Sequence, residues 1–286
     1  MTILKLIFSF NSKVHEIYYI SHPINFSIKE MYFIIEYIIQ YNYAKFSYMI
    51  KKYAFLILVN SLILSNECLG QKSTFNQRYT YKSGDFNGIG KWYMGREIAH
   101  VMGYQGIGWL ERSEREKEEN VSKLIQNMDI KPNDIIADVG AGSGYHVFRM
   151  SPLAKNGLVY AIDIQDKMLN TIKRIKEINK ITNVKTILGG EKNINLPKHS
   201  VDKILMVDVY HEFSFPVEMI ASIKNALKPN GQLFLIEYRG EDLNIPIKKI
   251  HKMTEKQSIM EMEAAGFMFK ENINNLPWQH CMVFEK

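Results

Sequence analysis

Cysteine is scarce in this sequence, with only Cys68 and Cys281 among 286 residues. Two cysteines cannot supply the framework of a disulfide-rich fold. If a leader that contains Cys68 is removed, Cys281 remains alone and no internal disulfide can form. Because Cys281 lies in an apolar stretch near the C terminus, we expect it in the core.

Blocks of like charge are also missing. The 36 Lys and Arg residues are dispersed among 30 Asp and Glu residues, for a net charge of +6. Nucleic-acid-binding surfaces usually show a clustered basic stripe, so we expect no nucleic-acid partner. The 46% apolar content is typical of a globular protein, and the length allows one large domain or two small ones.

The eight histidines are scattered, and none pairs with another histidine, a cysteine or an acid at a convincing ligand spacing. The sequence therefore predicts no metal site.

The first 70 residues lack glycine until Gly70, and aspartate is missing until Asp85. Lys51 and Lys52 precede an apolar run at 53–64, and small residues follow near Gly70. This order is typical of a secretory signal peptide, which we place at 49–70 with cleavage after Gly70. The run is short for a membrane-spanning helix, which needs about 20 residues. We therefore expect an exported, periplasmic protein with no stable membrane contact after cleavage.

Several alternatives to this leader stay open. Cys68 allows a lipoprotein signal, although Glu67 stands where such signals want a small residue. An uncleaved segment would anchor the domain outside the membrane, since Lys51 and Lys52 stay inside. An unused signal would leave the protein in the cytoplasm. If Met49 is the true start, residues 1–48 are a mistaken N-terminal extension.

Glycine and aromatic residues are dense at 71–112, which we interpret as a loop-rich lid with one short helix near 95–102. From residue 113 onward, apolar runs alternate with helical patterns. Capping-box sequences at 113–116 and 254–257 predict two helix starts. Strands are expected at 134–139, 158–164, 184–188, 202–209, 232–238, 267–273 and 280–284, with helices at 144–154, 166–179, 216–227 and 254–266. This order predicts an α/β fold with helices on both faces of a seven-stranded, mainly parallel, Rossmann-like sheet, closed by an antiparallel hairpin.

The stretch from Asp138 to Gly144, D-V-G-A-G-S-G, lies between the first strand and its helix. Glycines at alternate positions let the backbone turn sharply and approach a ligand closely. A dinucleotide fold requires G-x-G-x-x-G, whereas here Tyr145 follows Gly142 at the third position. The loop resembles motif I of the class I S-adenosylmethionine (SAM)-dependent methyltransferases, and the resemblance covers roughly residues 113–286.

The resemblance implies SAM as cofactor, with the glycine loop against its methionine part. Asp163 is the penultimate residue of the second expected strand, 25 positions after Asp138, where it can accept hydrogen bonds from both ribose hydroxyls. Asp208, at the end of the fourth strand, is implied beside the SAM amino group. The expected cofactor-binding residues are Asp138, Gly140, Ala141, Gly142, Gly144, Asp163, Ile164, Glu191 and Asp208. Of these, Glu191 would accept a hydrogen bond from the adenine amino group.

Methyl transfer depends mostly on holding the nucleophile in line with the methyl group. An oxygen or nitrogen acceptor also benefits from a base. We expect His211 as that base, with Glu212 or Asp208 orienting it; a half-buried polar turn is the alternative for His211 and Glu212. We also expect substrate contacts from Trp92, Tyr93, Arg96 and Tyr210, although Arg96 can equally form a salt bridge with a neighbour such as Glu97.

The sequence thus predicts a SAM-dependent methyltransferase that acts on a small molecule or a periplasmic component. Thiol acceptors are not expected, since cysteine is scarce. Export motivates an alternative, a methyltransferase-fold protein that binds a ligand without catalysis, because SAM is made in the cytoplasm. An NAD-dependent oxidoreductase is disfavoured by the glycine spacing. The acceptor and the oligomeric state are not readable from the sequence.

Overall fold

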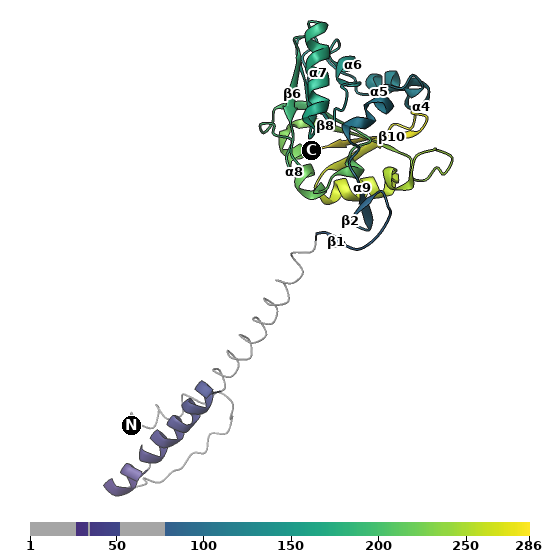
Figure 1. Ribbon diagram of the computed structural model, residues 1–286. Helices are drawn as coiled ribbons and strands as arrows, with labels where there is room; N and C mark the ends of the chain where they lie inside the picture. The colour runs from purple at the N-terminus through teal and green to yellow at the C-terminus, as the bar shows by residue number, and fades with distance from the viewer. Residues whose placement is uncertain (1–26, 34, 52–77) are drawn as a thin grey trace. The chain divides into compact units, whose positions relative to one another are not determined.

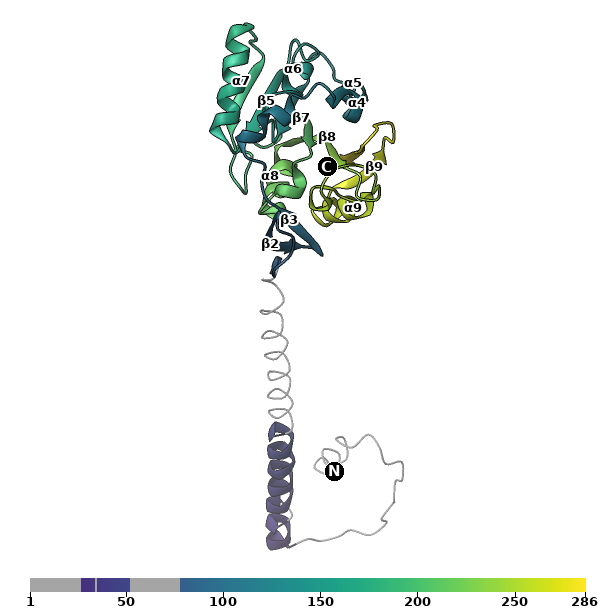
Figure 2. The same ribbon diagram turned by 45° about the vertical axis from the view of Figure 1, so that its right-hand side comes forward.

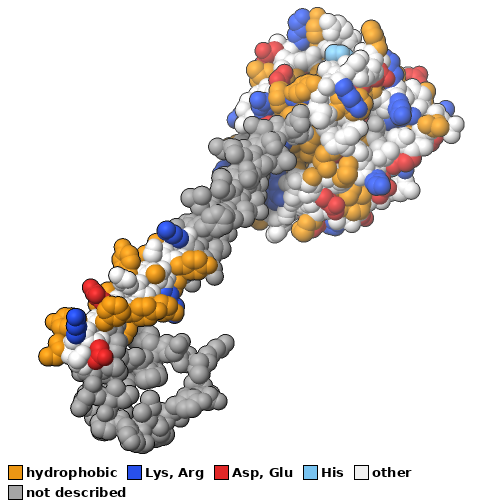
Figure 3. Space-filling model, turned by 90° about the horizontal axis from the view of Figure 1, so that it is seen from below, with side chains coloured by type: hydrophobic (Ala, Val, Ile, Leu, Met, Phe, Trp, Pro, Cys, Tyr) orange, Lys and Arg blue, Asp and Glu red, His pale blue; other side chains and the backbone are white. Residues whose placement is uncertain are grey.

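The computed structural model describes residues 27–33, 35–51 and 78–286. These fall into two units, Met1–Asn76 and Gln77–Lys286 (Figure 1). In the first unit, residues 28–33 and 35–51 are helical, and large apolar side chains such as Tyr32, Phe33 and Tyr43 are exposed (Figure 3). Within the described ranges, no helix combines the length and apolar character needed to cross a bilayer. Of the predicted signal peptide at 49–70, only residues 49–51 are described.

The second unit is built on a seven-stranded sheet with the order β6-β5-β4-β7-β8-β10-β9. The first five of these strands are parallel, and β10 pairs antiparallel with both β8 and β9. This confirms the predicted Rossmann-like sheet and its closing hairpin. The strands are β4 (Ile135–Val139), β5 (Leu158–Asp163), β6 (Val184–Leu188), β7 (Val201–Val207), β8 (Leu227–Tyr238), β9 (Met268–Asn272) and β10 (Gln279–Glu285).

Helices cover both faces of this sheet (Figures 1 and 2). One core cluster joins the sheet to α5 (Val121–Asn127), α6 (Val147–Met150) and α7 (Asp166–Ile178). The other joins it to α8 (Pro216–Ala226) and α9 (Glu255–Ala264). Adjacent residues of a strand face opposite sides, so Ile136 lies in one cluster and Ala137 in the other. Cys281 is buried in the first cluster, as predicted.

Two helix predictions were wrong in detail. The helix expected at 144–154 is reduced to α6, because the loop before it still turns at Gly144, whose φ is +87°. The capping box at 113–116 does not form. Instead α4 (Arg115–Glu119) begins after Glu114, and left-handed Asn120 separates it from α5. The helix start predicted at Thr254 is confirmed, since the Thr254 hydroxyl accepts a hydrogen bond from the Gln257 amide, whereas the Gln257 side chain donates to Met94 and Glu261 instead of closing the box.

The lid segment differs most from its prediction. Instead of a loop with a helix near 95–102, it forms an antiparallel sheet of β1 (Thr80–Tyr81), β2 (Gly88–Tyr93) and β3 (Arg96–Ala99). Met94 and Gly95 make the turn between β2 and β3, both with positive φ. The short helices η1 (Tyr104–Gly106) and α3 (Ile107–Leu110) follow.

A buried ion pair fastens this small sheet to the main domain. Arg96 of β3 contacts both carboxylate oxygens of Glu261 on α9, at 2.9 and 3.0 Å. The same carboxylate accepts hydrogen bonds from the Tyr210 hydroxyl and the Gln257 amide group. The Arg96 guanidinium also donates to the carbonyl oxygen of His211 at 3.1 Å. The lid sheet, α9 and the segment at 210–212 are therefore joined through one side chain.

We expect the substitution Glu261→Gln to lower the free energy of unfolding by about 3 kcal/mol, because it leaves the Arg96 charge buried without its partner. Denaturant unfolding of the full chain measures this loss. Glu263→Gln, on the exposed side of the same helix, is the matched control and should change stability little. Equal effects of the two substitutions would contradict the anchoring role.

Candidate functional site

A cavity of about 830 Å³ opens at the carboxyl ends of the parallel strands. Residues at or just after the ends of four neighbouring strands line it, namely Val139 at the end of β4, Asp163 at the end of β5, Gly189 after β6 and Asp208 after β7. In open parallel sheets this edge, where the strand order reverses, is where ligands bind. The fold therefore brings Asp163 and Asp208, both singled out in the sequence, to the expected edge of the sheet.

The glycine loop forms one wall of the cavity. The amide groups of Gly140 and Ala141 both donate to the carbonyl oxygen of Ile162 on β5. Gly142 has a φ of +53°, and a Cβ atom there would lie 2.6 Å from the Leu110 side chain. The loop thus presents bare backbone to the cavity, with Gly140 and Gly142 at its surface.

Asp163 is tied to this loop. Its Oδ2 accepts a hydrogen bond from the Gly142 amide at 2.9 Å, and its Oδ1 accepts one from the Gln165 amide at 2.8 Å. Burial raises the pKa of Asp163, and these amide groups oppose the rise. Each carboxylate oxygen has a second lone pair, so the side chain retains acceptor capacity toward the cavity that it lines.

Not every predicted cofactor residue reaches the cavity. Asp138 is buried, and Asp138, Ala141 and Gly144 are absent from the cavity lining. These three shape the loop from behind. The predicted residues that do line the cavity are Gly140, Gly142, Asp163, Ile164, Glu191, Asp208, His211 and Glu212.

Asp208 has a φ of +49° and an incompletely satisfied side chain. Its Oδ2 accepts a hydrogen bond from Gln279, whereas its buried Oδ1 has no partner within the described part of the chain. Burial raises the pKa of Asp208 well above its usual value, and the nearby charges of Glu119 and Glu237 add to the rise. An unpaired carboxylate oxygen in a cavity wall indicates a position that a ligand donor completes.

His211 lies in the 3-10 helix η2 (Tyr210–Glu212) and is oriented by Glu237 of β8. Its Nδ1 is 2.6 Å from Glu237 Oε2, and Glu237 Oε1 accepts hydrogen bonds from the Tyr210 and His211 amides. Burial is the largest single effect and lowers the pKa of His211, but the charge of Glu237, its hydrogen bond to the ring and the charge of Glu212 together outweigh burial and raise the pKa. The expectation that Glu212 or Asp208 orients His211 is corrected, because Glu237 holds that position.

Glu212 points into the cavity and also holds the lid. Its Oε1 accepts a hydrogen bond from the Met102 amide at 3.1 Å. The Met102 carbonyl in turn accepts one from the Gln165 side chain at 3.0 Å. Burial raises the pKa of Glu212 to about 7. The lid is therefore fastened both to the β5 side and to the β7 side of the cavity.

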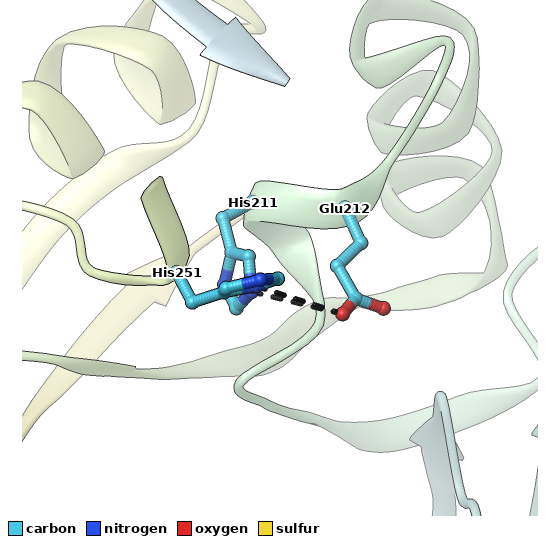
Figure 4. Close-up of side chains that lie close together, drawn as sticks. All are labelled: His211, Glu212 and His251. Atoms are coloured by element: carbon cyan, nitrogen blue, oxygen red, sulfur yellow. Dashed lines mark hydrogen bonds and ion pairs between the residues drawn. The ribbon is translucent and has the colours of Figure 1, made fainter. Parts of the chain in front are cut away.

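The sequence pattern indicated no metal-ligating cluster, yet the fold assembles one group that could hold a metal. His251, from η3 (Lys249–His251), places its Nδ1 3.1 Å from His211 Nε2 (Figure 4). Glu212 Oε1 lies 3.9 Å from each of these nitrogen atoms. Burial lowers the pKa of His251 to about 4, and the charge of His211 contributes. We call His211, Glu212 and His251 the polar corner.

The predicted substrate residues lie elsewhere. Trp92, Tyr93, Arg96 and Tyr210 are not among the residues that line the cavity. The Arg96 guanidinium is held by Glu261, so it is not available to a substrate anion, and the Tyr210 hydroxyl donates to the same carboxylate. The expectation of direct substrate contact is thus unsupported for these four, while the alternative of a salt bridge is confirmed for Arg96 with a partner from α9.

Sequence reasoning also missed cavity residues from distant segments. Arg115 and Glu119 of α4 line the cavity and form an ion pair at 2.7 Å, and the Tyr238 hydroxyl donates to Glu119. His251 and Glu237 were missed as well. Their only sequence signal was an acid near the end of the fifth strand and a histidine in the loop that follows it.

Comparison with known proteins places the chain in a family. Residues 130–280 match the model of a family described as a methyltransferase domain. The chain belongs to this methyltransferase family. The match spans the glycine loop, Asp163, Asp208 and the whole polar corner.

Curated relatives agree with this membership. The chain is 29% identical over 124 residues to a tRNA U34 carboxymethyltransferase of Desulfotalea psychrophila, covering 43% of this chain and 37% of that protein. It is 29% identical over 141 residues to the ubiquinone/menaquinone biosynthesis C-methyltransferase UbiE of Wigglesworthia glossinidia brevipalpis, covering 49% and 56%. It is 30% identical over 144 residues to the uncharacterized methyltransferase YdaC of Bacillus subtilis, covering 50% and 76%. The chain thus spans only about a third to a half of the first two relatives.

A solved SAM-dependent methyltransferase from Aquifex aeolicus has the same fold, with a TM-score of 0.61 and 24% identity over 64% of this chain and 98% of that one. The family assigns SAM as the cofactor. The cavity fits it, because bare glycine backbone, the free lone pairs of Asp163 and the unpaired Asp208 oxygen face or border the same space.

Because of the buried Asp138, we expect the stability of the fold to depend on pH. Burial raises its pKa from 3.8 to about 7, partly offset by Arg115 and increased by Asp163. The folded state therefore binds this proton more tightly than the unfolded state, and the associated stability is lost as pH rises from about 4 to about 7. We expect the free energy of unfolding of Asp138→Asn to equal that of the wild type at pH 4 and to exceed it above pH 7, by up to about 4 kcal/mol.

Thermal unfolding at a series of pH values, without added ligand, measures this difference. Asp129→Asn is the control, because Asp129 is exposed and its pKa is lowered rather than raised. A constant difference between wild type and Asp138→Asn across this pH range would contradict the prediction.

Proposed function

We propose that the protein transfers the methyl group of SAM to a small-molecule acceptor held in the cavity. One observation carries the proposal: a single cavity is lined both by the glycine loop with Asp163 and by the polar corner. The first set suits the cofactor, and the second suits a reacting polar group. Shared walls bring the two within one space, as an in-line transfer requires.

When bound, SAM supplies a methyl group activated by its sulfonium. The backbone of Gly140 and Gly142 would pack against its methionine part, and Asp163 would accept hydrogen bonds from its ribose. The unpaired oxygen of Asp208 would accept a hydrogen bond from its amino group. Glu191, an exposed residue after β6 that lines the cavity, would accept a hydrogen bond from the adenine amino group.

The acceptor would lie between the polar corner and the lid. Apolar side chains from the lid segment and from the loop after β8 also line the cavity. Such side chains bury the body of a ligand while a few polar groups orient it. The polar corner would stabilise the charge that develops on the acceptor's nucleophilic group as that group loses its proton. These apolar lining residues are Phe86, Val101, Trp109, Pro246 and Ile247.

A small acceptor is favoured over RNA, although some relatives are named for tRNA. Of the described residues that line the cavity, Arg115 and Lys248 are the Lys and Arg side chains. Arg115 is paired with Glu119 and is buried. On the face drawn in Figure 3, Lys and Arg side chains are dispersed among acidic and apolar ones. Nucleic acid recognition relies on a clustered basic footprint.

The place of the reaction is part of the proposal. Residues 49–70 keep the composition of a signal peptide, so we propose that the protein is exported and that the domain acts outside the cytoplasm. Cell fractionation with N-terminal sequencing tests this. Recovery of a cytoplasmic protein that begins at Met1 would refute it.

Binding of the cofactor provides the first test of function. We expect the full chain to bind SAM and S-adenosylhomocysteine in calorimetric titration, and Asp163→Asn to weaken both by about ten- to a hundredfold, the usual worth of hydrogen bonds to a charged group. Asp166→Asn is the matched control, since Asp166 is exposed at the start of α7 and does not line the cavity.

The second test is turnover. Labelled SAM should transfer its methyl group to members of a panel of small phenols, enols and quinols, and not to total tRNA. Failure to bind either form of the cofactor would reject the enzyme. Binding without transfer to any acceptor would support the non-catalytic alternative. Transfer to tRNA alone would overturn the choice of a small acceptor.

A further inference from the structure

The polar corner has the dimensions of a metal centre. Its three donor atoms are His211 Nε2, His251 Nδ1 and Glu212 Oε1, which form a triangle with sides of 3.1, 3.9 and 3.9 Å. The circle through the three atoms has a radius of about 2.1 Å, which is the distance at which Zn²⁺ binds imidazole nitrogen and carboxylate oxygen. The space between the three donors is therefore large enough for a single ion.

The surroundings of the donors match those of metal ligands. Ligating histidines usually bond their other ring nitrogen to a carboxylate or a carbonyl, which fixes the ring and the free lone pair. His211 does so through Glu237, at 2.6 Å. Ligating carboxylates are themselves hydrogen-bonded, and Glu212 accepts from the Met102 amide with the same oxygen that faces the two imidazoles. Both ligands are thus supported from behind.

The three ligands leave room for a fourth. All of them line the cavity, and the His251 side chain is 25% exposed while that of His211 is 2% exposed. Three protein ligands with an open position toward a cavity are typical of a catalytic zinc site rather than of a structural one. Two imidazoles with one carboxylate favour a first-row transition metal over Mg²⁺ or Ca²⁺, which prefer oxygen ligands.

We propose that His211, His251 and Glu212 bind one divalent transition-metal ion, such as Zn²⁺, at the acceptor end of the cavity. The ion's open position takes an oxygen atom of the acceptor, which assigns the substrate class as phenols, enols or alcohols. When the hydroxyl group binds, its O–H bond breaks, a metal–oxygen bond forms and the proton leaves to solvent through the cavity mouth. This substrate class rests on the proposed methyl transfer, whereas the metal site itself does not.

The site is tested with Zn²⁺ on the full chain after treatment with a chelator. We expect calorimetric titration and elemental analysis to show one ion per chain. His251→Ala and Glu212→Gln should each weaken Zn²⁺ binding by about tenfold or more. His199→Ala is the matched control, because His199 is exposed and does not line the cavity; it should bind Zn²⁺ like the wild type.

Cobalt provides a second measurement that is independent of affinity. Co²⁺ bound at the polar corner should give visible absorption bands that are present in the wild type and in His199→Ala but lost in His251→Ala. Circular dichroism shows whether the variants are folded. If His251→Ala does not fold, Glu212→Gln replaces it in the test. Absence of Zn²⁺ binding, or equal binding by all four proteins, would overturn the metal site.

Different outcomes would reject the metal site and the proposed methyl transfer. SAM binding and methyl transfer that persist in the chelator-treated protein would leave the methyltransferase intact and overturn the metal's role. Zn²⁺ binding at the polar corner without SAM binding would support the metal site and reject methyl transfer. Restoration of methyl transfer by added Zn²⁺ after chelation, in the wild type and not in Glu212→Gln, would support both.

Discussion

The acceptor end of the cavity depends on the buried carboxylate of Glu237. It is fully buried at the end of a central strand and accepts hydrogen bonds from the amides of Tyr210 and His211 as well as contacting the His211 ring. A buried carboxylate costs a large desolvation energy unless such donors surround it. The turn after β7 supplies these donors, so the same interaction satisfies the acid, shapes the turn and aims His211 at the cavity.

The lid is held in a similar way, by hydrogen bonds between side chains and backbone groups. Arg96 reaches the His211 carbonyl from the small sheet, while Met102 bridges Gln165 and Glu212 across the cavity. The lid segment is thus bonded both to Gln165, after β5, and to the segment at 210–212, after β7. Each contact joins a backbone group of one partner to a side chain of the other. Because these partners lie far from the lid in the sequence, the lid's position depends on distant residues.

The sheet was predictable because its signals are local. Apolar strands, the glycine loop and Asp163 each follow from a few adjacent residues, and their order alone determines a doubly wound fold. The small lid sheet was not, because its glycine-punctuated strands lack an alternating pattern. The orienting role of Glu237 and the contact of His251 with His211 span 26 and 40 residues, and no periodicity links residues so far apart.

The cavity gathers carboxyl groups in a buried setting. Asp163, Asp208 and Glu212 all line it, and burial raises the pKa of each. The charge of Arg115, which is paired with Glu119, offsets part of the rise at Asp208. Buried carboxylates that repel one another destabilise the unliganded fold, and a cationic ligand removes that cost on binding. A sulfonium cofactor and a divalent ion are both cations, so either of the proposed ligands would favour the ionised form of these carboxyl groups.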